Sequence, residues 1–369
     1  MRVLIIGEFS AFAKNLAKGI NLLEGHEAIV FSNEDGFKKI MQDGKSFTYP
    51  CVQNVKIFGK SIKGTSFING CKLYKQFKED LKPFYHYFDI AFIISYTLLR
   101  RENNHCLPRF SIEDIKYAVK DSGKIFLSSC GGDMAFNKFA LGDKRFMTVY
   151  TDKKILNNHS YIKLENKVKE IVDGVIPMSY QYHEAYRLYG DGFKLLDAIP
   201  LPFDYTTVPA KKTFYSKGKI VLFNGALRPT KGTKFINEAI EKICQKYPEK
   251  VELRNDRLPY DQFLAFLKQI DIYVDLCTDY DYGMSALAAM AAGCVVLSGN
   301  EPETRKCFQD DKIPVVSLTP DVNQIYDALE RLITSPSEIE IIGRNSIKYV
   351  SEKHSCQLIA ARYINVFQQ

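Results

Sequence analysis

No apolar run in this sequence is long enough to cross a membrane as a helix, since none approaches the roughly 18 to 20 residues required. The opening residues, Met-Arg-Val-Leu-Ile-Ile-Gly, are too short for a secretory signal and are typical of a strand that ends in a turn. We therefore expect a cytoplasmic protein. On this view, any contact with the cell membrane is peripheral and at its inner face.

Motifs of metal, disulfide and nucleic-acid chemistry are missing as well. The nine cysteines contain no Cys-x-x-Cys pair and the six histidines no pair at metal-ligand spacing, so we expect reduced thiols and no metal. Gly7, Glu8 and Ser10 follow the first apolar run without a Gly-x-Gly-x-x-Gly pattern, which disfavours a dinucleotide cofactor. No recognition-helix or RNP-type aromatic motif indicates nucleic-acid binding, and the pI of about 8.7 is modest.

What the chain does contain is a regular alternation of apolar, strand-like runs with helical segments. Its 369 residues exceed the usual size of one hydrophobic core, and 46% apolar with 25% charged residues is ordinary for a globular protein. The strand-like runs lie at residues 3–6, 28–31, 90–95, 125–128 and 175–178, and then at 220–223, 251–253, 272–274, 294–297 and 315–317. This alternation predicts an α/β protein with two doubly wound, Rossmann-like domains that face a cleft.

The domain boundary is expected in the polar stretch 205–218, which contains Pro and Gly and is typical of a linker. We therefore predict an N-terminal domain at 1–204 and a C-terminal domain at 219–345. The remaining residues, 346–369, are predicted to form a C-terminal helix that packs back on the N-terminal domain.

The most informative segment is residues 279–297, which predicts a tight turn, a small-residue helix and a buried strand. The turn through Gly283 opens the helix at about Met284, so unpaired backbone N–H groups and the positive helix end face a ligand above the sheet. Gly293 ends the helix before the strand at 294–297. This arrangement fits a diphosphate, although small residues also serve packing in any strand–helix–strand unit.

A second segment, residues 220–236, predicts a strand, a Gly-containing loop and a helix that begins near Thr233. Arg228 and Lys231 fall where the loop turns into that helix, so two cations stand beside a helix N-terminus. A planar guanidinium and a point-charge ammonium together suit a diphosphate whose charge grows during a reaction. The alternative is a solvated basic loop between strand and helix.

These two segments, in this order, resemble the C-terminal half of retaining glycosyltransferases of the GT-B fold, the family called glycosyl transferase group 1. The resemblance implies that Arg228, Lys231 and Gly232 form a diphosphate clamp and that Gly283 and Met284 form a backbone cradle. It extends through residues 302–303 and 320–367, and more loosely through 1–7, 25–27, 129–133 and 173–179.

The sequence departs from that family at its paired glutamates, whose positions hold Tyr280 and Ala288. In the family, the first glutamate touches the donor sugar and the second holds the ribose hydroxyls. Asp279 and Asp281 flank the first position and are candidates to replace it, or are solvated turn residues. Nothing obvious replaces the second glutamate. Cys130 stands where many relatives place a histidine.

Further residues are expected at the cleft. Asp133, in a Gly-Gly-Asp turn after the strand at 125–128, is predicted to bind donor or acceptor hydroxyls, and capping the next helix is the alternative. We group it with Arg228 and Lys231 as catalytic. The donor-side candidates are Gly232, Asp281, Tyr282, Gly283, Met284, Ser285 and Leu258, and the acceptor-side candidates are Gly7, Glu8, Ser10, Cys130 and Gly131. Backbone atoms near Leu258 are expected to read the base, so the sequence does not choose between UDP and GDP.

Positive charge is concentrated in one part of the N-terminal half. Six lysines and no acid occur between Cys51 and Lys78, interleaved with aromatic residues: Lys56, Lys60, Lys63, Lys72, Lys75 and Lys78. This stretch, from Lys56 to Lys78, predicts reversible contact with an anionic membrane surface. The alternative is a solvated face whose aromatic residues turn to the core.

Taken with the resemblance, these features predict a metal-independent glycosyltransferase. It is expected to move a hexose-type sugar from a nucleoside-diphosphate sugar, UDP- or GDP-linked, to a saccharide or lipid-linked acceptor with retention, in cell-surface polysaccharide synthesis. No cofactor other than this donor substrate is expected. The alternatives are a degenerate, non-catalytic nucleotide-sugar-binding protein and a nucleotide-sugar 2-epimerase of the same fold.

Overall fold

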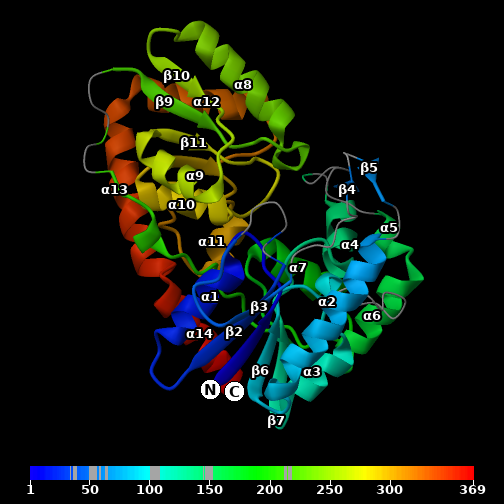
Figure 1. The fold of residues 1–369 in the computed structure, drawn as a ribbon. Helices are drawn as coiled ribbons and strands as arrows, with labels where there is room; N and C mark the ends of the chain where they lie inside the picture. Colours follow the sequence, from blue (N-terminus) through cyan, green and yellow to red (C-terminus); the bar gives the residue numbers. More distant parts are fainter. Residues whose placement is uncertain are drawn as a thin grey trace.

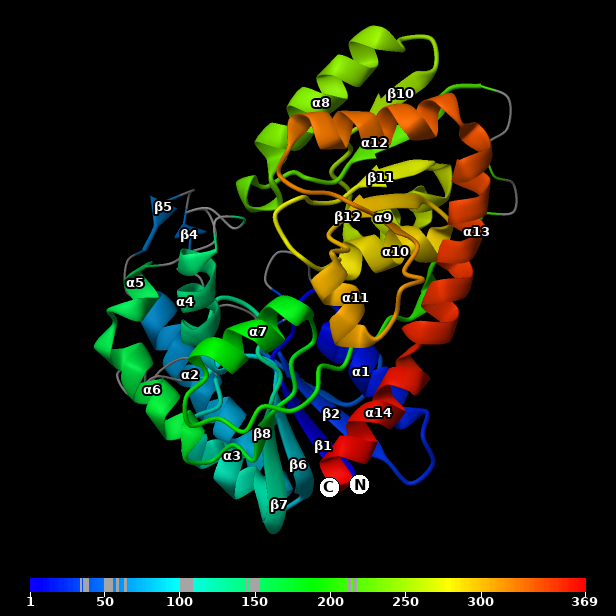
Figure 2. The same ribbon diagram turned by 180° about the vertical axis from the view of Figure 1, so that it is seen from behind.

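Each of the strand-like runs of the sequence forms a strand of one of two parallel sheets in the computed structural model (Figures 1 and 2). The structure describes residues 1–33, 35, 40–49, 56–57, 60–62, 65–99, 109–143, 145, 153–211, 214 and 218–369. Parts of the predicted linker and of the basic stretch, including Lys63, therefore lie outside the described residues.

The N-terminal domain is built on a six-stranded sheet with the order β3-β2-β1-β6-β7-β8. Its strands are β1 (Arg2–Ile6), β2 (Glu27–Ser32), β3 (Ser46–Thr48), β6 (Phe88–Ile93), β7 (Val119–Leu127) and β8 (Gly174–Val175). Its helices are α1 (Phe12–Asn21), α2 (Thr65–Leu81), α3 (Ile112–Ala118), α4 (Met134–Gly142), α5 (Lys153–Leu156), α6 (His159–Lys169) and α7 (Tyr180–Tyr189). A small antiparallel pair, β4 (Lys56–Ile57) and β5 (Lys60–Ser61), stands apart from the sheet.

The C-terminal domain has a five-stranded sheet with the order β10-β9-β11-β12-β13. Its strands are β9 (Ile220–Asn224), β10 (Val251–Arg254), β11 (Ile272–Val274), β12 (Val295–Ser298) and β13 (Val315–Ser317). The helices are α8 (Thr233–Lys246), α9 (Tyr260–Phe266), α10 (Met284–Ala292), α11 (Pro302–Phe308), α12 (Val322–Thr334) and α13 (Pro336–Lys353). The predicted pair of doubly wound domains is confirmed.

Both sheets are buried on their two faces, which explains their continuous apolar runs. Along β1, Val3 and Ile5 belong to one hydrophobic core while Leu4 and Ile6 belong to another on the opposite face. Parallel strands covered by helices on both sides read as unbroken apolar segments rather than as alternating ones. The order of strands reverses beside β1 and beside β9, and the carboxyl ends of such strands form the ligand crevice of doubly wound sheets.

The chain passes between the domains twice, and the two crossings lie side by side. The N–H of Phe203 donates to the carbonyl oxygen of His354 at 2.7 Å. The first crossing reaches the C-terminal domain at Lys211. The N–H of Lys211 donates to the carbonyl oxygen of Ala292 at 3.0 Å. The chain leaves α13 at His354 and enters α14 (Cys356–Gln368), so the range 346–369 holds the end of α13 and a separate helix.

Helix α14 completes the N-terminal domain, and both chain termini lie there in Figures 1 and 2. Tyr363 and Phe367 pack on Phe92, with ring centroids 5.1 and 5.7 Å apart. A Cβ atom at Gly19 of α1 would lie only 2.1 Å from the carbonyl oxygen of Cys356. Glycine at this position therefore lets the two helices approach closely.

A polar set of contacts joins the domains on the side of α7 and α11. Arg145 pairs with Glu301 and donates to the carbonyl oxygen of Leu318 at 3.1 Å. The hydroxyl of Tyr280 donates to Asp143 Oδ2 at 2.7 Å, and the guanidinium of Arg145 lies 4.6 Å from the Tyr280 ring centroid. These contacts link the two domains.

Across the part of the chain that the structure describes, we find no helix with both the length and the apolar character to pass through a membrane.

Candidate functional site

A cavity of about 1210 Å³ lies between the domains, and residues of both line it. It opens where β1, β9 and β11 end, which is the position expected for a ligand in doubly wound sheets. The predicted site residues that line it are Ser10, Cys130, Arg228, Lys231, Leu258, Gly283, Met284 and Ser285. Acceptor-side and donor-side candidates thus meet at one cavity.

The ammonium group of Lys231 is held by three acceptors of the protein. Its Nζ lies 2.5 Å from Asp275 Oδ1, 3.4 Å from the carbonyl oxygen of Gly225 and 3.5 Å from Ser285 Oγ. Asp275 follows β11, is fully buried, and also accepts from the hydroxyls of Ser285 and Ser298 at 2.8 and 3.2 Å. A buried carboxylate therefore balances the charge of Lys231.

The loop that carries Arg228 and Lys231 is fixed by close packing at Gly232. This residue ends the short 3-10 helix η6 (Pro229–Lys231) with φ 79°, and a Cβ there would lie 2.2 Å from Cys277 Sγ. Both the positive φ and the contact favour glycine, so Gly232 shapes the loop but does not line the cavity. The side chain of Arg228 is exposed and makes no ion pair with any described residue.

The first turn of α10 faces the cavity as predicted for the backbone cradle. Gly283 is the N-cap, and Gly283, Met284, Ser285 and Ala288 line the cavity. No side chain caps the helix, which leaves its first N–H groups for a ligand. Ala288, at the position of the missing second glutamate, is 2% exposed and leaves that part of the lining without a carboxylate.

The turn before α10 differs from the prediction in where its side chains point. Asp279 lines the cavity, but Tyr280, Asp281 and Tyr282 do not. The Asp281 carboxylate accepts from the N–H groups of Tyr180 and Gln181 at 3.3 and 3.2 Å, and the Tyr282 hydroxyl lies 2.9 Å from His354 Nε2. The predicted donor contacts of the Asp281 and Tyr282 side chains are corrected accordingly: Asp281 binds the N-terminal domain, and Tyr282 binds the residue at the end of α13.

Asp133 has the helix-capping role that was the alternative to a catalytic one. Its carboxylate is fully buried and accepts from the N–H of Phe136 at 2.9 Å, the hydroxyl of Tyr186 at 2.9 Å and Ser129 Oγ at 3.4 Å. Burial raises the pKa of this carboxyl to about 6. Asp133 is not part of the cavity lining, so the structure corrects its placement among residues that touch substrate.

Among the acceptor-side candidates, Ser10 and Cys130 line the cavity, whereas Gly7, Glu8 and Gly131 are not among its lining residues. Glu8 is 1% exposed, and its Oε2 accepts from the N–H of Lys14 and from Gln42 Nε2, both at 3.0 Å. Burial raises the pKa of the Glu8 carboxyl. Its contact with Lys14, in the first turn of α1, makes Glu8 a cap of that helix.

The lining beyond β10 comes from one loop and the start of α9. Leu258 was predicted there, and it is accompanied by Arg257, Pro259, Tyr260 and Phe263. Sequence reasoning missed Arg257, Tyr260 and the buried Asp275. Their signal was positional, since each lies near the carboxyl end of a predicted strand in the C-terminal domain.

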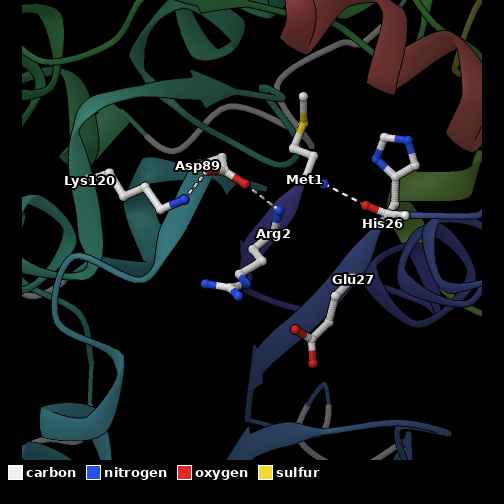
Figure 3. A pocket seen from close by; sticks show the side chains of 7 residues that line it. Met1, Arg2, His26, Glu27, Asp89 and Lys120 are labelled. Atoms are coloured by element: carbon white, nitrogen blue, oxygen red, sulfur yellow. Dashed lines mark hydrogen bonds and ion pairs between the residues drawn. The ribbon is translucent and has the colours of Figure 1, made fainter.

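A smaller hollow of about 450 Å³ lies at the other end of the N-terminal sheet (Figure 3). Arg2 N–H and Lys120 Nζ both donate to Asp89, at 2.7 and 2.5 Å, and the amino group of Met1 donates to Gly25 O at 2.6 Å. Its polar groups are largely used in contacts with one another. We therefore place the candidate site in the cavity between the domains.

Comparisons with known proteins identify proteins of similar sequence or fold. Residues 225–365 match the family described as "Glycosyl transferase-like". No curated protein is significantly similar to the sequence. HepE of Anabaena, solved in complex with UDP and glucose, is 12% identical with a TM-score of 0.60 and covers 100% of this chain and 99% of its own.

Two further solved structures share the arrangement over the whole chain. Sucrose-phosphate synthase of Thermosynechococcus elongatus is 12% identical with a TM-score of 0.64, covering 100% of this chain and 99% of its own. The N-terminal domain of trehalose-6-phosphate phosphatase from Candida albicans is 10% identical with a TM-score of 0.61, covering 100% and 96%. These structures confirm the predicted GT-B fold. The predicted resemblance to glycosyltransferases is supported over residues 225–365.

Proposed function

We propose that this protein transfers a hexose-type sugar from a nucleoside-diphosphate sugar to a saccharide or lipid-linked acceptor. The observation that carries the proposal is the convergence of Arg228, Lys231 and the uncapped N-terminus of α10 on one cavity. All three elements stabilise an anion, and all three follow β9 or β11, the neighbouring strands between which the strand order reverses. HepE, which shares the fold, was solved with UDP and glucose and supports a sugar nucleotide as donor.

The proposed chemistry follows from where charge develops. As the bond between the sugar and the diphosphate breaks, negative charge grows on the leaving group beside Arg228, Lys231 and the N–H groups of α10. Donors placed in advance at that position lower the barrier by several kcal/mol, on the order of 3 kcal/mol for one lost donor. The anomeric carbon becomes oxocarbenium-like, and an acceptor hydroxyl attacks from the same face with retention while its proton passes to an oxygen of the departing diphosphate. The protein's own cations and amides meet the charge in this proposal, without a metal.

The acceptor is proposed to enter from the N-terminal domain, where Ser10 and Cys130 line the cavity. A peripheral contact with anionic membrane would bring a lipid-linked acceptor there, as in the proposed role in cell-surface polysaccharide synthesis. The membrane contact is supported by the start of α2, where Phe67 and Ile68 are 65% and 56% exposed. Lys72 and Lys75 are exposed on the same helix. Lys78 contributes less, because it pairs with the buried carboxylate of Asp114.

A binding protein without turnover is the second candidate, and one observation favours it. Tyr280 occupies the position of the donor-sugar glutamate and binds Asp143 of the other domain instead of lining the cavity. The test is a panel of UDP- and GDP-linked hexoses, analysed for released nucleotide and for sugar products. Transfer or donor hydrolysis supports the proposal. Binding with no product supports the second candidate, an epimeric nucleotide sugar identifies an epimerase, and no binding of any donor or of UDP or GDP rejects the proposal.

A further inference from the structure

The charged side chains that line the cavity do not contribute equally to its potential. Among the described lining residues, the cations are Lys14, Arg228, Lys231 and Arg257, and the carboxylates are Asp261, Asp275 and Asp279. Lys14 Nζ lies 3.0 Å from Asp43 and Lys231 Nζ lies 2.5 Å from Asp275, so each of these ammonium charges is paired. Neither Arg228 nor Arg257 makes an ion pair within the part of the chain that the structure describes.

Lys231 is also limited in the hydrogen bonds that it can offer a ligand. An ammonium group has three N–H donors, and three acceptors of the protein already lie within 3.5 Å of Lys231 Nζ: Asp275 Oδ1, Gly225 O and Ser285 Oγ. A diphosphate must therefore displace or share one of them. A nucleoside diphosphate carries more than one negative charge, so a further cation at the cavity would add to the contribution of Arg228.

Arg257 is the other lining cation that makes no ion pair with a described residue. It is exposed on the loop between β10 and α9, and it lines the same cavity as Arg228. The neighbouring Arg254 is engaged elsewhere, because its Nε and Nη2 lie 2.9 and 3.1 Å from Asp256 and its Nη1 lies 3.6 Å from Glu252. Arg254 is thus engaged in local ion pairs, whereas Arg257 lines the cavity.

We propose that Arg257 is a phosphate-binding residue of this site, which meets the diphosphate of the bound nucleotide together with Arg228. The proposal rests on the proposed function, since it assigns a further contact to the same donor. A guanidinium presents a planar fork of donors that matches phosphate oxygens, and it stays charged at all working pH values. Arg257 therefore adds affinity for the phosphates and none for the nucleoside alone.

The experiment compares uridine with UDP by titration calorimetry on the wild type, Arg257→Ala and Arg254→Ala, with guanosine and GDP as a second pair. We expect Arg257→Ala to weaken UDP binding by about tenfold or more, as for a lost hydrogen bond to a charged group, and to leave uridine binding unchanged. Arg254→Ala is the matched control, because Arg254 ends β10 three residues before Arg257, and it should bind both ligands as the wild type does. Arg257→Lys should recover part of the loss.

The other outcomes of this titration separate the role of Arg257 from the proposed function. Equal UDP affinity in Arg257→Ala and the wild type overturns the role of Arg257 while leaving the proposed function intact. An equal loss for uridine and UDP also overturns it, because Arg257 would then contact the base or ribose. Binding of neither UDP nor GDP by the wild type rejects the proposed function itself. Arg257 is exposed, so thermal unfolding of Arg257→Ala should match that of the wild type and confirm an intact fold.

Discussion

The carboxylate of Asp281, in the C-terminal domain, caps the helix that begins at Tyr180 in the N-terminal domain. Its two oxygens accept from the N–H groups of Tyr180 and Gln181, and the local N-cap residue, Ser179, makes no such contact with its side chain. A carboxylate at a helix N-terminus is favoured both by these hydrogen bonds and by the helix dipole. The C-terminal domain therefore supplies the side-chain cap that this helix of the N-terminal domain lacks.

Burial raises the pKa of the Asp281 carboxyl to about 6, above its ordinary value of 3.8. The native protein then keeps a proton that the unfolded chain releases, so this group makes the free energy of unfolding fall as pH rises from about 4 to about 6. We expect Asp281→Asn to remove that dependence, on the order of 2 kcal/mol across the window. Urea unfolding of both proteins from pH 4 to 7 measures it. Asp133 titrates in the same range, so the difference between wild type and variant isolates Asp281; parallel profiles would contradict the prediction.

Because Lys231 pairs with Asp275, we expect Lys231→Ala and Arg228→Ala to differ in stability although both lower activity. Lys231→Ala leaves a buried carboxylate without its counter-ion and should lower the free energy of unfolding by about 3–5 kcal/mol, while Arg228→Ala, at an exposed position, should leave it nearly unchanged. Both should reduce transfer by on the order of a hundredfold. The double variant Lys231→Ala/Asp275→Asn should regain stability but not turnover. Chemical unfolding and donor-release kinetics test both statements, and wild-type turnover in Arg228→Ala and Lys231→Ala would remove the diphosphate assignment.

Replacing Ala288 by glutamate tests whether the ribose lies beside α10. Ala288 lines the cavity one turn after Ser285, so a glutamate there can reach a ligand held at the helix N-terminus. We expect Ala288→Glu to tighten UDP or GDP binding by about tenfold, since a charged acceptor for hydroxyls contributes about 1.5–3 kcal/mol. Ala288→Gln, of equal length and no charge, is the control. Weaker binding by the glutamate variant, with tight binding by the wild type, would show that the ribose is held in another way.

The proposed membrane contact predicts salt-sensitive binding to anionic vesicles. Each exposed lysine near the surface contributes roughly 1 kcal/mol, and the effect fades with ionic strength. Lys72→Glu/Lys75→Glu should therefore abolish co-sedimentation at low salt, whereas Lys78→Gln should change it little because that lysine pairs with Asp114. Equal binding to neutral and anionic vesicles, or none at low salt, would mean that the lysines form a solvated face.

The fold could be predicted because its strands are buried on both faces. Segments such as β1 and β12 are continuous apolar runs, which can be recognised in the sequence without any tertiary information. The strand β3, with one buried residue between two exposed ones, gives no such signal and was missed. The break between α13 and α14 was also missed, because His354 and Ser355 are ordinary residues whose role is set by the crossing with Phe203.

Site residues could be predicted where their position at the end of a strand or the start of a helix is enough to place them at the cavity. Arg228, Lys231 and Gly283 lie at carboxyl ends of strands or at a helix start, and all three line the cavity. A polar residue in a turn can point either way, so the sequence did not distinguish the cap Asp133 from a substrate contact. The partner of Lys231 depends on β11 lying beside β9, a tertiary contact that the sequence does not reveal.

Helix α14 lies in the N-terminal domain although it is the last helix of the chain. During synthesis, residues 356–368 emerge after the rest of the N-terminal domain, so we expect the parts of α1 and Phe92 that α14 covers to stay uncovered until then. Nascent chains usually fold their first domain early, but here we expect the surface that α14 covers to be completed only at the end of elongation. A truncation before Cys356 should remain bound to chaperones or precipitate, and a circular permutant that starts at Ser355 should shorten that exposure.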